Sequence, residues 1–162
     1  MVIFNFLKSV GQKLTPGKED EPAKRAELSD QELADLTFQN RLTRYAIELG
    51  IPVEGLKVRF KSGKATVEGV AESQAQRENV IIAIGNTEGV EAVDDRMTVV
   101  HPAPEAVFYT VKSGDTLSKI AKEHYGNASR YPAIFEANRP MLSNPDKIYP
   151  GQVLRIPREG EK

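Results

Sequence analysis

The side chains that could catalyse a reaction or bind a metal are scattered along this chain, and few have a chemical partner nearby. His101 and His124 are isolated and cysteine is absent, which disfavours a transition-metal site and a cysteine nucleophile. Asp94 and Asp95 are adjacent, but the acidic series at alternate positions that a calcium loop needs does not follow them. This pattern favours a solvated strand face over a metal site.

The hydroxyl groups and the other paired carboxylates lack the surroundings that catalysis needs. Ser113, Thr116 and Ser118 have no histidine close in sequence to act as a base. The acidic run at residues 19–21 lies in a charged stretch interrupted by proline, which does not provide the rigid geometry of general acid/base catalysis. The sequence therefore predicts a protein that is not an enzyme.

Length, composition and charge indicate two small soluble domains. The chain has 162 residues, of which 40% are hydrophobic, and its 22 basic and 23 acidic residues give a net charge of -1. Such a balance favours neither nucleic acid nor an anionic membrane as partner. No stretch approaches the roughly 18 apolar residues of a membrane span, and the opening lacks the features of a secretion signal. We therefore expect an unexported, cytoplasmic protein without stable membrane insertion.

The first 29 residues divide into an apolar segment and a charged one. Residues 1–14 carry apolar side chains at helical spacing, namely Ile3, Phe6, Leu7, Val10 and Leu14. We expect an amphipathic helix that packs on the protein's own core. Docking on a membrane surface is the alternative, for which two lysines provide a weak anchor. Residues 15–29 are charged and interrupted by proline, and they predict a flexible linker.

Residues 30–100 predict the order helix, strand, strand, helix, strand. The first helix begins near Asp30 and stops before Gly50, and a hairpin then turns at residues 62–63. A second helix ends at Gly85 and Asn86, and a third strand follows within residues 90–99. Residues 101–106 predict a stiff linker that makes few hydrogen bonds.

Residues 107–158 predict the order strand, helix, helix, strand. The alternation at residues 108–112 indicates a short strand, Gly114 suits a tight turn, and Asp115 is the expected N-cap of the next helix. A second helix follows Gly126, and the last strand covers residues 153–156. The fold class is therefore α+β, with two small domains in succession.

Both domains resemble known families. The segment from Tyr109 to Ala121, with residues 148–157, resembles a LysM domain. The αββαβ order, with Gly69 ending the second strand and residues 89–93 opening the third, resembles a BON domain. Together with residues 4–8, 83–86 and 143–151, the ordered pair resembles the bacterial family of potassium-binding proteins. This resemblance implies a monomeric cytoplasmic K+ sensor or buffer that compacts on binding one ion, with a role in osmotic stress.

A potassium site needs no charged side chain, since neutral carbonyl oxygens can replace the water shell of this large cation. The last carbonyls of a helix lack partners in the helix and lie at the negative end of its dipole. Gly11 and residues 85–89 mark two such ends, although these glycines are also explained as ordinary helix stops. The resemblance implies main-chain carbonyl ligands from six residues, namely Leu7, Val10, Gln12, Gly85, Thr87 and Val90.

The rival hypothesis is glycan binding, because LysM modules usually bind N-acetylglucosamine polymers such as peptidoglycan outside the cytoplasm. The resemblance places such a groove between one loop and the segment opposite it, formed by Gly114, Asp115, Thr116 and Leu117 against Ile148 and Tyr149. The same residues are equally well explained as turns, a helix start and a small core. A third possibility is that the LysM domain docks on the BON domain or on another protein.

Overall fold

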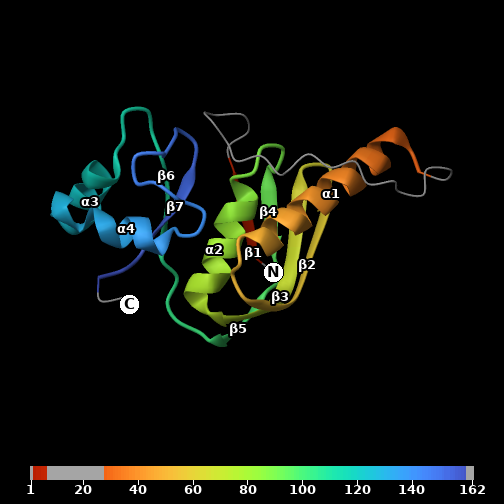
Figure 1. Cartoon of the computed structure of the whole chain (residues 1–162), viewed down its shortest axis with the longest axis horizontal. Coiled ribbons are helices and arrows are strands. Elements are labelled where there is room, and N and C mark those ends of the chain that lie inside the picture. The colour runs from red at the N-terminus through yellow and green to blue at the C-terminus, as the bar shows by residue number, and fades with distance from the viewer. Residues whose placement is uncertain (1, 7–27, 160–162) are drawn as a thin grey trace.

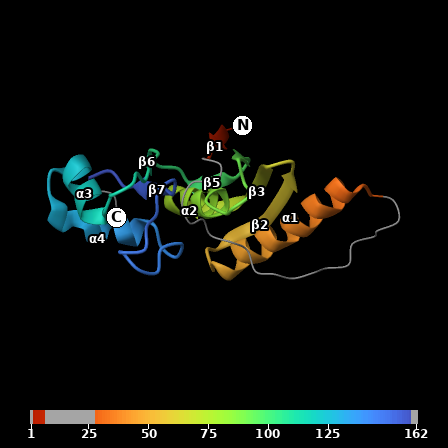
Figure 2. The same ribbon diagram turned by 90° about the horizontal axis from the view of Figure 1, so that it is seen from above.

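The computed structural model describes residues 2–6 and 28–159 of the chain. Two sheets organise this part of the molecule, a five-stranded sheet in the first half and a two-stranded sheet in the second (Figure 1). Helices α1 and α2 lie over one side of the larger sheet, as the view from above shows (Figure 2). None of the helices in the described ranges is long and apolar enough to cross a membrane.

Helix α1 covers Asp30–Glu48 and begins with a capping box. The hydroxyl of Ser29 accepts a hydrogen bond from the backbone N–H of Glu32, and the Glu32 carboxylate accepts one from the backbone N–H of Ser29. The hydrogen bond from the Ser29 backbone, and after it the one from the Ser29 side chain, holds the pKa of Glu32 below its ordinary value. The helix ends before Gly50, as its sequence predicts.

Strands β2 (Val53–Lys61) and β3 (Lys64–Ser73) form the expected antiparallel hairpin. The prediction of a single third strand is wrong, because two short strands are found in its place. β4 (Ala92–Asp95) and β5 (Thr98–His101) both pair in parallel with β3, one after the other. Between them the backbone N–H of Met97 donates to the Asp95 carboxylate at 2.9 Å, and this local bond interrupts the strand.

The structure of the N-terminal segment also differs from the prediction. The helix expected from Met1 is wrong at Val2–Asn5, which form strand β1 and pair antiparallel with β4 at the edge of the sheet. Phe4 and Phe6 are partly buried while Ile3 and Asn5 are exposed, so the side chains follow the period of a strand. Phe4 and Phe6 pack against the core of the first half. Residues 7–14 and the linker at 15–27 lie outside the described ranges.

Helix α2 (Gln74–Gly85) is buried on both sides. Val80, Ile81 and Ile84 belong to the core beneath the five-stranded sheet. Ile82 and Ala83 belong to a second core, which is otherwise built mainly from residues after position 110. The second half of α2 is apolar on all sides, which is typical of a buried helix, because both halves of the molecule pack on it.

The second half has the predicted order of elements. Strands β6 (Val107–Thr110) and β7 (Val153–Ile156) pair antiparallel and are separated by α3 (Leu117–Tyr125), the short 3-10 helix η1 (Ala128–Arg130) and α4 (Tyr131–Ala137). The predicted N-cap is wrong, because Thr116 rather than Asp115 caps α3. Asp115 instead accepts hydrogen bonds from the Tyr109 hydroxyl and the Lys112 backbone.

Candidate functional site

The C-terminal end of α2 presents main-chain carbonyl groups. Its last turn contains no basic residue. The carbonyls of Ile82, Ala83 and Ile84 accept from the Asn86 N–H, the Thr87 hydroxyl and the Thr87 N–H, respectively. The carbonyl of Gly85 accepts no hydrogen bond from the described residues. The Gly85 carbonyl thus lies at the negative end of the helix dipole.

The loop after α2 is short and tightly held. Thr87 is fully buried, and its carbonyl accepts from the backbone N–H of Val90 at 3.1 Å. Gly89 has φ +98°, a conformation that other residues adopt only with strain. Glu91 then anchors the exit of the loop by donating its N–H to the Gly63 carbonyl at 2.7 Å. The carbonyls of Gly85, Thr87 and Val90 thus belong to one constrained loop.

The N-terminal strand meets this loop. The backbone N–H of Phe6 donates to the Glu91 carbonyl at 2.8 Å. The Phe6 ring also lies against Gly85, where an added Cβ would come within 1.9 Å of the ring. Gly85 is therefore needed for close approach to Phe6. The other three expected carbonyl residues, Leu7, Val10 and Gln12, lie outside the described ranges.

The side chain of Asn86, at the centre of this loop, reaches the other half of the molecule. Its Nδ2 donates to the Val153 carbonyl and its Oδ1 accepts from the Val153 N–H, both at 2.8 Å. Asn86 is fully buried. Sequence reasoning missed this role because an Asn after a helix-ending Gly is a common helix stop, and nothing in its spacing indicates a partner 67 residues away.

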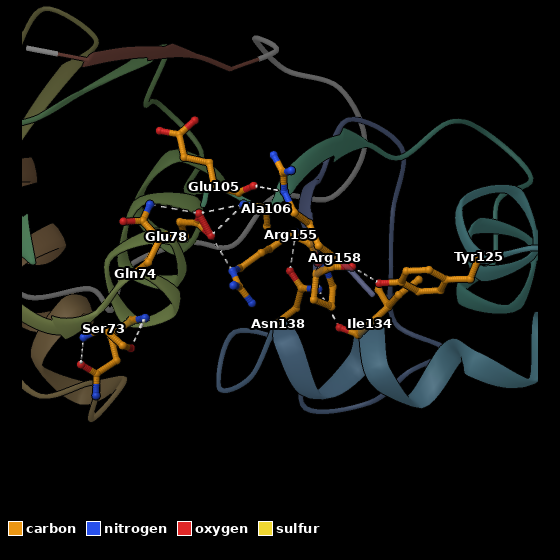
Figure 3. Close-up of polar contacts among 12 residues, drawn as sticks. Ser73, Gln74, Glu78, Glu105, Ala106, Tyr125, Ile134, Asn138, Arg155 and Arg158 are labelled. Atoms are coloured by element: carbon orange, nitrogen blue, oxygen red, sulfur yellow. Dashed lines mark hydrogen bonds and ion pairs between the residues drawn. The ribbon is translucent and has the colours of Figure 1, made fainter. Parts of the chain in front are cut away.

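A second polar connection lies two turns earlier on α2. Figure 3 shows the Glu78 carboxylate among Gln74, Ala106 and Arg155. The Arg155 Nε lies 2.8 Å from Glu78 Oε1, and the two side chains are only 3% and 4% exposed. The backbone N–H of Ala106 also donates to Glu78, so this end of the expected linker is held in place. Glu78 therefore ties α2 to β7 and to the approach to β6.

The residues expected to form a glycan groove lie in two neighbouring segments. Val111 bonds through its backbone to Gly151 and Gln152, which brings the loop containing Gly114, Asp115, Thr116 and Leu117 beside the segment with Ile148 and Tyr149. Gly114 and Thr116 are exposed, while Leu117 is buried. Tyr45 and Leu49 of α1 pack against the same core as Ile148. One side of this region is thus near the first half of the molecule.

The acidic and histidine residues that the structure describes do not combine into a metal centre. Within the described ranges no group of three or more His, Cys, Asp or Glu side chains is arranged to hold a metal ion. Asp94 and Asp95 are buried and bond to Arg96 and Arg77, so the expectation of a solvated strand face is wrong for them.

Each half of the chain matches a known domain family. Residues 41–101 match the BON domain family and residues 109–157 match the LysM domain family. The chain is 45% identical over 160 residues to the potassium binding protein Kbp of Escherichia coli O6:H1, covering 98% of this chain and all of that protein. The chain belongs to the Kbp family. The BON match begins inside α1 and contains the loop at residues 85–90.

Other relatives share only parts with this member of the Kbp family. An uncharacterized protein of Deinococcus radiodurans is 57% identical over 49 residues, covering 30% of this chain and 19% of that protein. Esterase Rv1288 of Mycobacterium tuberculosis is 31% identical over 114 residues, covering 70% of this chain and 22% of the esterase. The likeness to the esterase is therefore confined to a small part of that protein, whereas the likeness to Kbp covers 98% of this chain and all of Kbp.

Proposed function

We propose that this protein binds one K+ ion through main-chain carbonyl oxygens and acts as a monomeric cytoplasmic potassium sensor or buffer. The proposed ligands are the carbonyls of Gly85, Thr87 and Val90, with those of Leu7, Val10 and Gln12 completing the shell. The observation that carries the proposal is the end of α2, where the Gly85 carbonyl accepts no hydrogen bond from the described residues and no basic side chain occupies the last turn.

The chemistry of this site suits potassium. Neutral carbonyl dipoles from a constrained loop can replace the weakly held water shell of K+ without the charge density that favours divalent ions. The Thr87 carbonyl already accepts from Val90, but a carbonyl oxygen has two lone pairs and can also face an ion. The relative Kbp is named for binding potassium, and this supports the same ion here.

Compaction follows from the connections of the loop. Phe6 ties the N-terminal strand to it, and Asn86 ties the LysM half to it. An ion bound between the loop and the N-terminal segment would therefore favour the state in which all three parts are together. We propose docking on the BON half as the role of this LysM domain in preference to glycan binding, since Asn86 and Glu78 both hold β7.

Isothermal titration with KCl against NaCl at matched ionic strength tests the ion. Specific binding gives a saturable heat with K+ that Na+ does not reproduce, whereas screening treats both salts alike. Equal responses to the two salts would reject the proposed function. A parallel pull-down on insoluble peptidoglycan tests the LysM domain, and retention of the full chain there would favour glycan binding.

A further inference from the structure

One contact between the two halves of the molecule involves a sulfur atom. Asn86 Nδ2 lies 3.3 Å from Met141 Sδ, and the two residues are 55 positions apart in the chain. The same nitrogen donates to the Val153 carbonyl at 2.8 Å. The amide group of this fully buried side chain thus meets two acceptors of the LysM half, a carbonyl oxygen and a thioether. A thioether is a weak acceptor, so the second contact depends on close packing.

Met141 packs in the core that both halves build. It belongs to the same cluster as Ile82 and Ala83 of α2. Met97, the other methionine of the described ranges, is 4% exposed in the core of the first half, whereas Met141 is 9% exposed in a turn after α4. A turn opens locally at a lower free energy than the core of a sheet does. Of these two sulfur atoms, that of Met141 is therefore the more accessible to a small oxidant.

Oxidation changes the chemistry of this contact. A peroxide transfers one oxygen atom to a thioether: the O–O bond breaks, an S–O bond forms, the sulfur loses two electrons, and hydrogen peroxide leaves as water. An N–H···O bond alone spans about 2.9 Å, so a separation of 3.3 Å leaves no room for an oxygen between Met141 and Asn86. The sulfoxide oxygen must push the two side chains apart or enter the apolar core, and both destabilise the contact.

We propose that Met141 is a redox modification site, and that its oxidation by a peroxide loosens the contact between the two halves. The chain has no cysteine, so no thiol competes for the peroxide. The modification is reversible, because sulfoxide reductases release the oxygen as water while a dithiol becomes a disulfide. Since Asn86 lies between Gly85 and Thr87, oxidation should also lower the affinity of the α2 loop for K+, and this consequence alone rests on the proposed function.

Two backbone amides of β7 make the proposal testable. The Val153 N–H donates to Asn86 Oδ1 across the contact between the halves. The Arg155 N–H donates to Asn138 Oδ1 within the LysM half. Both amides belong to the same strand, but only the first loses its acceptor when the halves loosen. Their rates of hydrogen exchange therefore separate a change at the contact from a general loss of stability.

The experiment treats the full chain, labelled with ¹⁵N, with hydrogen peroxide until mass spectrometry of its peptides finds Met141 oxidised and Met97 intact. Exchange of the Val153 amide should then become faster by about tenfold or more, because its buried hydrogen bond is weakened. Exchange of the Arg155 amide should change far less. The side-chain amide signal of Asn86 should shift as well, and methionine sulfoxide reductases of both classes with dithiothreitol should restore the original signals.

Met141→Leu is the matched control, because leucine keeps the volume of the side chain and forms no sulfoxide. Peroxide should leave Val153 exchange unchanged in this variant, in which Met1 is still present. Oxidation of Met97 before Met141, equal acceleration at Val153 and Arg155, or the same acceleration in Met141→Leu would each overturn the proposal. Faster exchange at Val153 without a change in K+ affinity would support the modification site and count against the ion site at the α2 loop.

Discussion

Asn86 and Val153 form a reciprocal pair of hydrogen bonds across the two halves of the molecule, with both distances at 2.8 Å. Asn138 makes the same kind of pair with the backbone of Arg155, two residues further along β7. Residues two apart in a strand direct their backbone groups to the same edge. Two buried asparagines thus satisfy the edge of β7 that β6 leaves unpaired, one from each half of the chain.

We predict that Asn86→Ala weakens the contact between the two halves. The substitution leaves the buried N–H and C=O of Val153 without partners, at a cost of about 1–3 kcal/mol for each group. Chemical denaturation should give a lower free energy of unfolding, and K+ affinity should fall. Asn138→Ala is the matched control, since it removes the side chain that bonds the backbone N–H and C=O of Arg155 from within the LysM half. It should destabilise the protein without lowering K+ affinity, and an equal loss of affinity in both variants would contradict the role of Asn86.

We predict that Gly85→Ala displaces the Phe6 ring. The added methyl would lie 1.9 Å from the ring, and a ring at the end of a side chain can swing away at the cost of its packing. In a Phe6→Ala background the same substitution should be neutral or stabilising by up to about 1 kcal/mol, because Ala is the better helix former. A double-mutant cycle measured by thermal unfolding checks this coupling. Additive effects of the two substitutions would show that ring and loop are independent.

We predict that Glu78→Gln destabilises the protein far more than a change at a surface ion pair. The substitution leaves the buried Arg155 without its counter-charge, and such losses cost about 3–5 kcal/mol. Glu68→Gln, which breaks an ion pair with the 61% exposed Arg59, should cost about 1 kcal/mol or less. Urea denaturation of both variants provides the comparison. Similar losses in the two would mean that Glu78 is open to water in solution.

The pairing of Tyr109 with Asp115 predicts a pH effect. The hydrogen bond to Asp115 at 2.6 Å, followed by burial, raises the pKa of Tyr109 to about 12. A raised pKa in the folded state gives stability that is present below the unfolded value of about 10 and is lost as the pH rises toward 12. Absorbance titration of the tyrosinates should show one group moving toward pH 10 in Asp115→Ala. Tyr109→Phe identifies that group, and an unchanged titration in Asp115→Ala would refute the pairing.

The pKa of Asp115, the other member of this pair, is shifted in the opposite direction. Burial opposes ionisation of Asp115, but the hydrogen bonds from Tyr109 and Lys112 outweigh it and lower its pKa. Its contribution to stability is therefore present above the unfolded value of about 4 and is lost as the pH falls through the folded value. Thermal unfolding between pH 2 and 5 should show a smaller acid loss for Asp115→Ala than for the unmodified chain.

The sequence predicts most elements because their signals are local. The Gly after α1 marks the end of a helix, and the alternation around residues 62–63 marks a hairpin. The N-terminal segment was misread because Ile3 and Phe6 fit a helical period while Phe4 and Phe6 fit a strand. Pairing with β4 decides between the two periods, and a short segment cannot show in its own sequence that it will pair with a strand far along the chain.

The candidate site was harder to predict for a physical reason. A carbonyl site depends on backbone conformation, so the side chains at Gly85, Thr87 and Val90 show only that a helix ends there. Family resemblance, and no spacing of residues, indicated these positions. The roles of Asn86 and Glu78 depend on contacts with residues 67 and 77 positions away, which local patterns do not reveal.

Carbonyl ¹³C chemical shifts, followed during titration with KCl and with NaCl at matched ionic strength, test the central claim most directly. The account predicts that K+ shifts the carbonyl signals of Gly85, Thr87 and Val90 in a saturable way, together with those of Leu7, Val10 and Gln12, while Na+ does so far more weakly. Unchanged carbonyl signals at residues 85–90 in the presence of bound K+ would contradict this site, and equal shifts with both salts would contradict its selectivity.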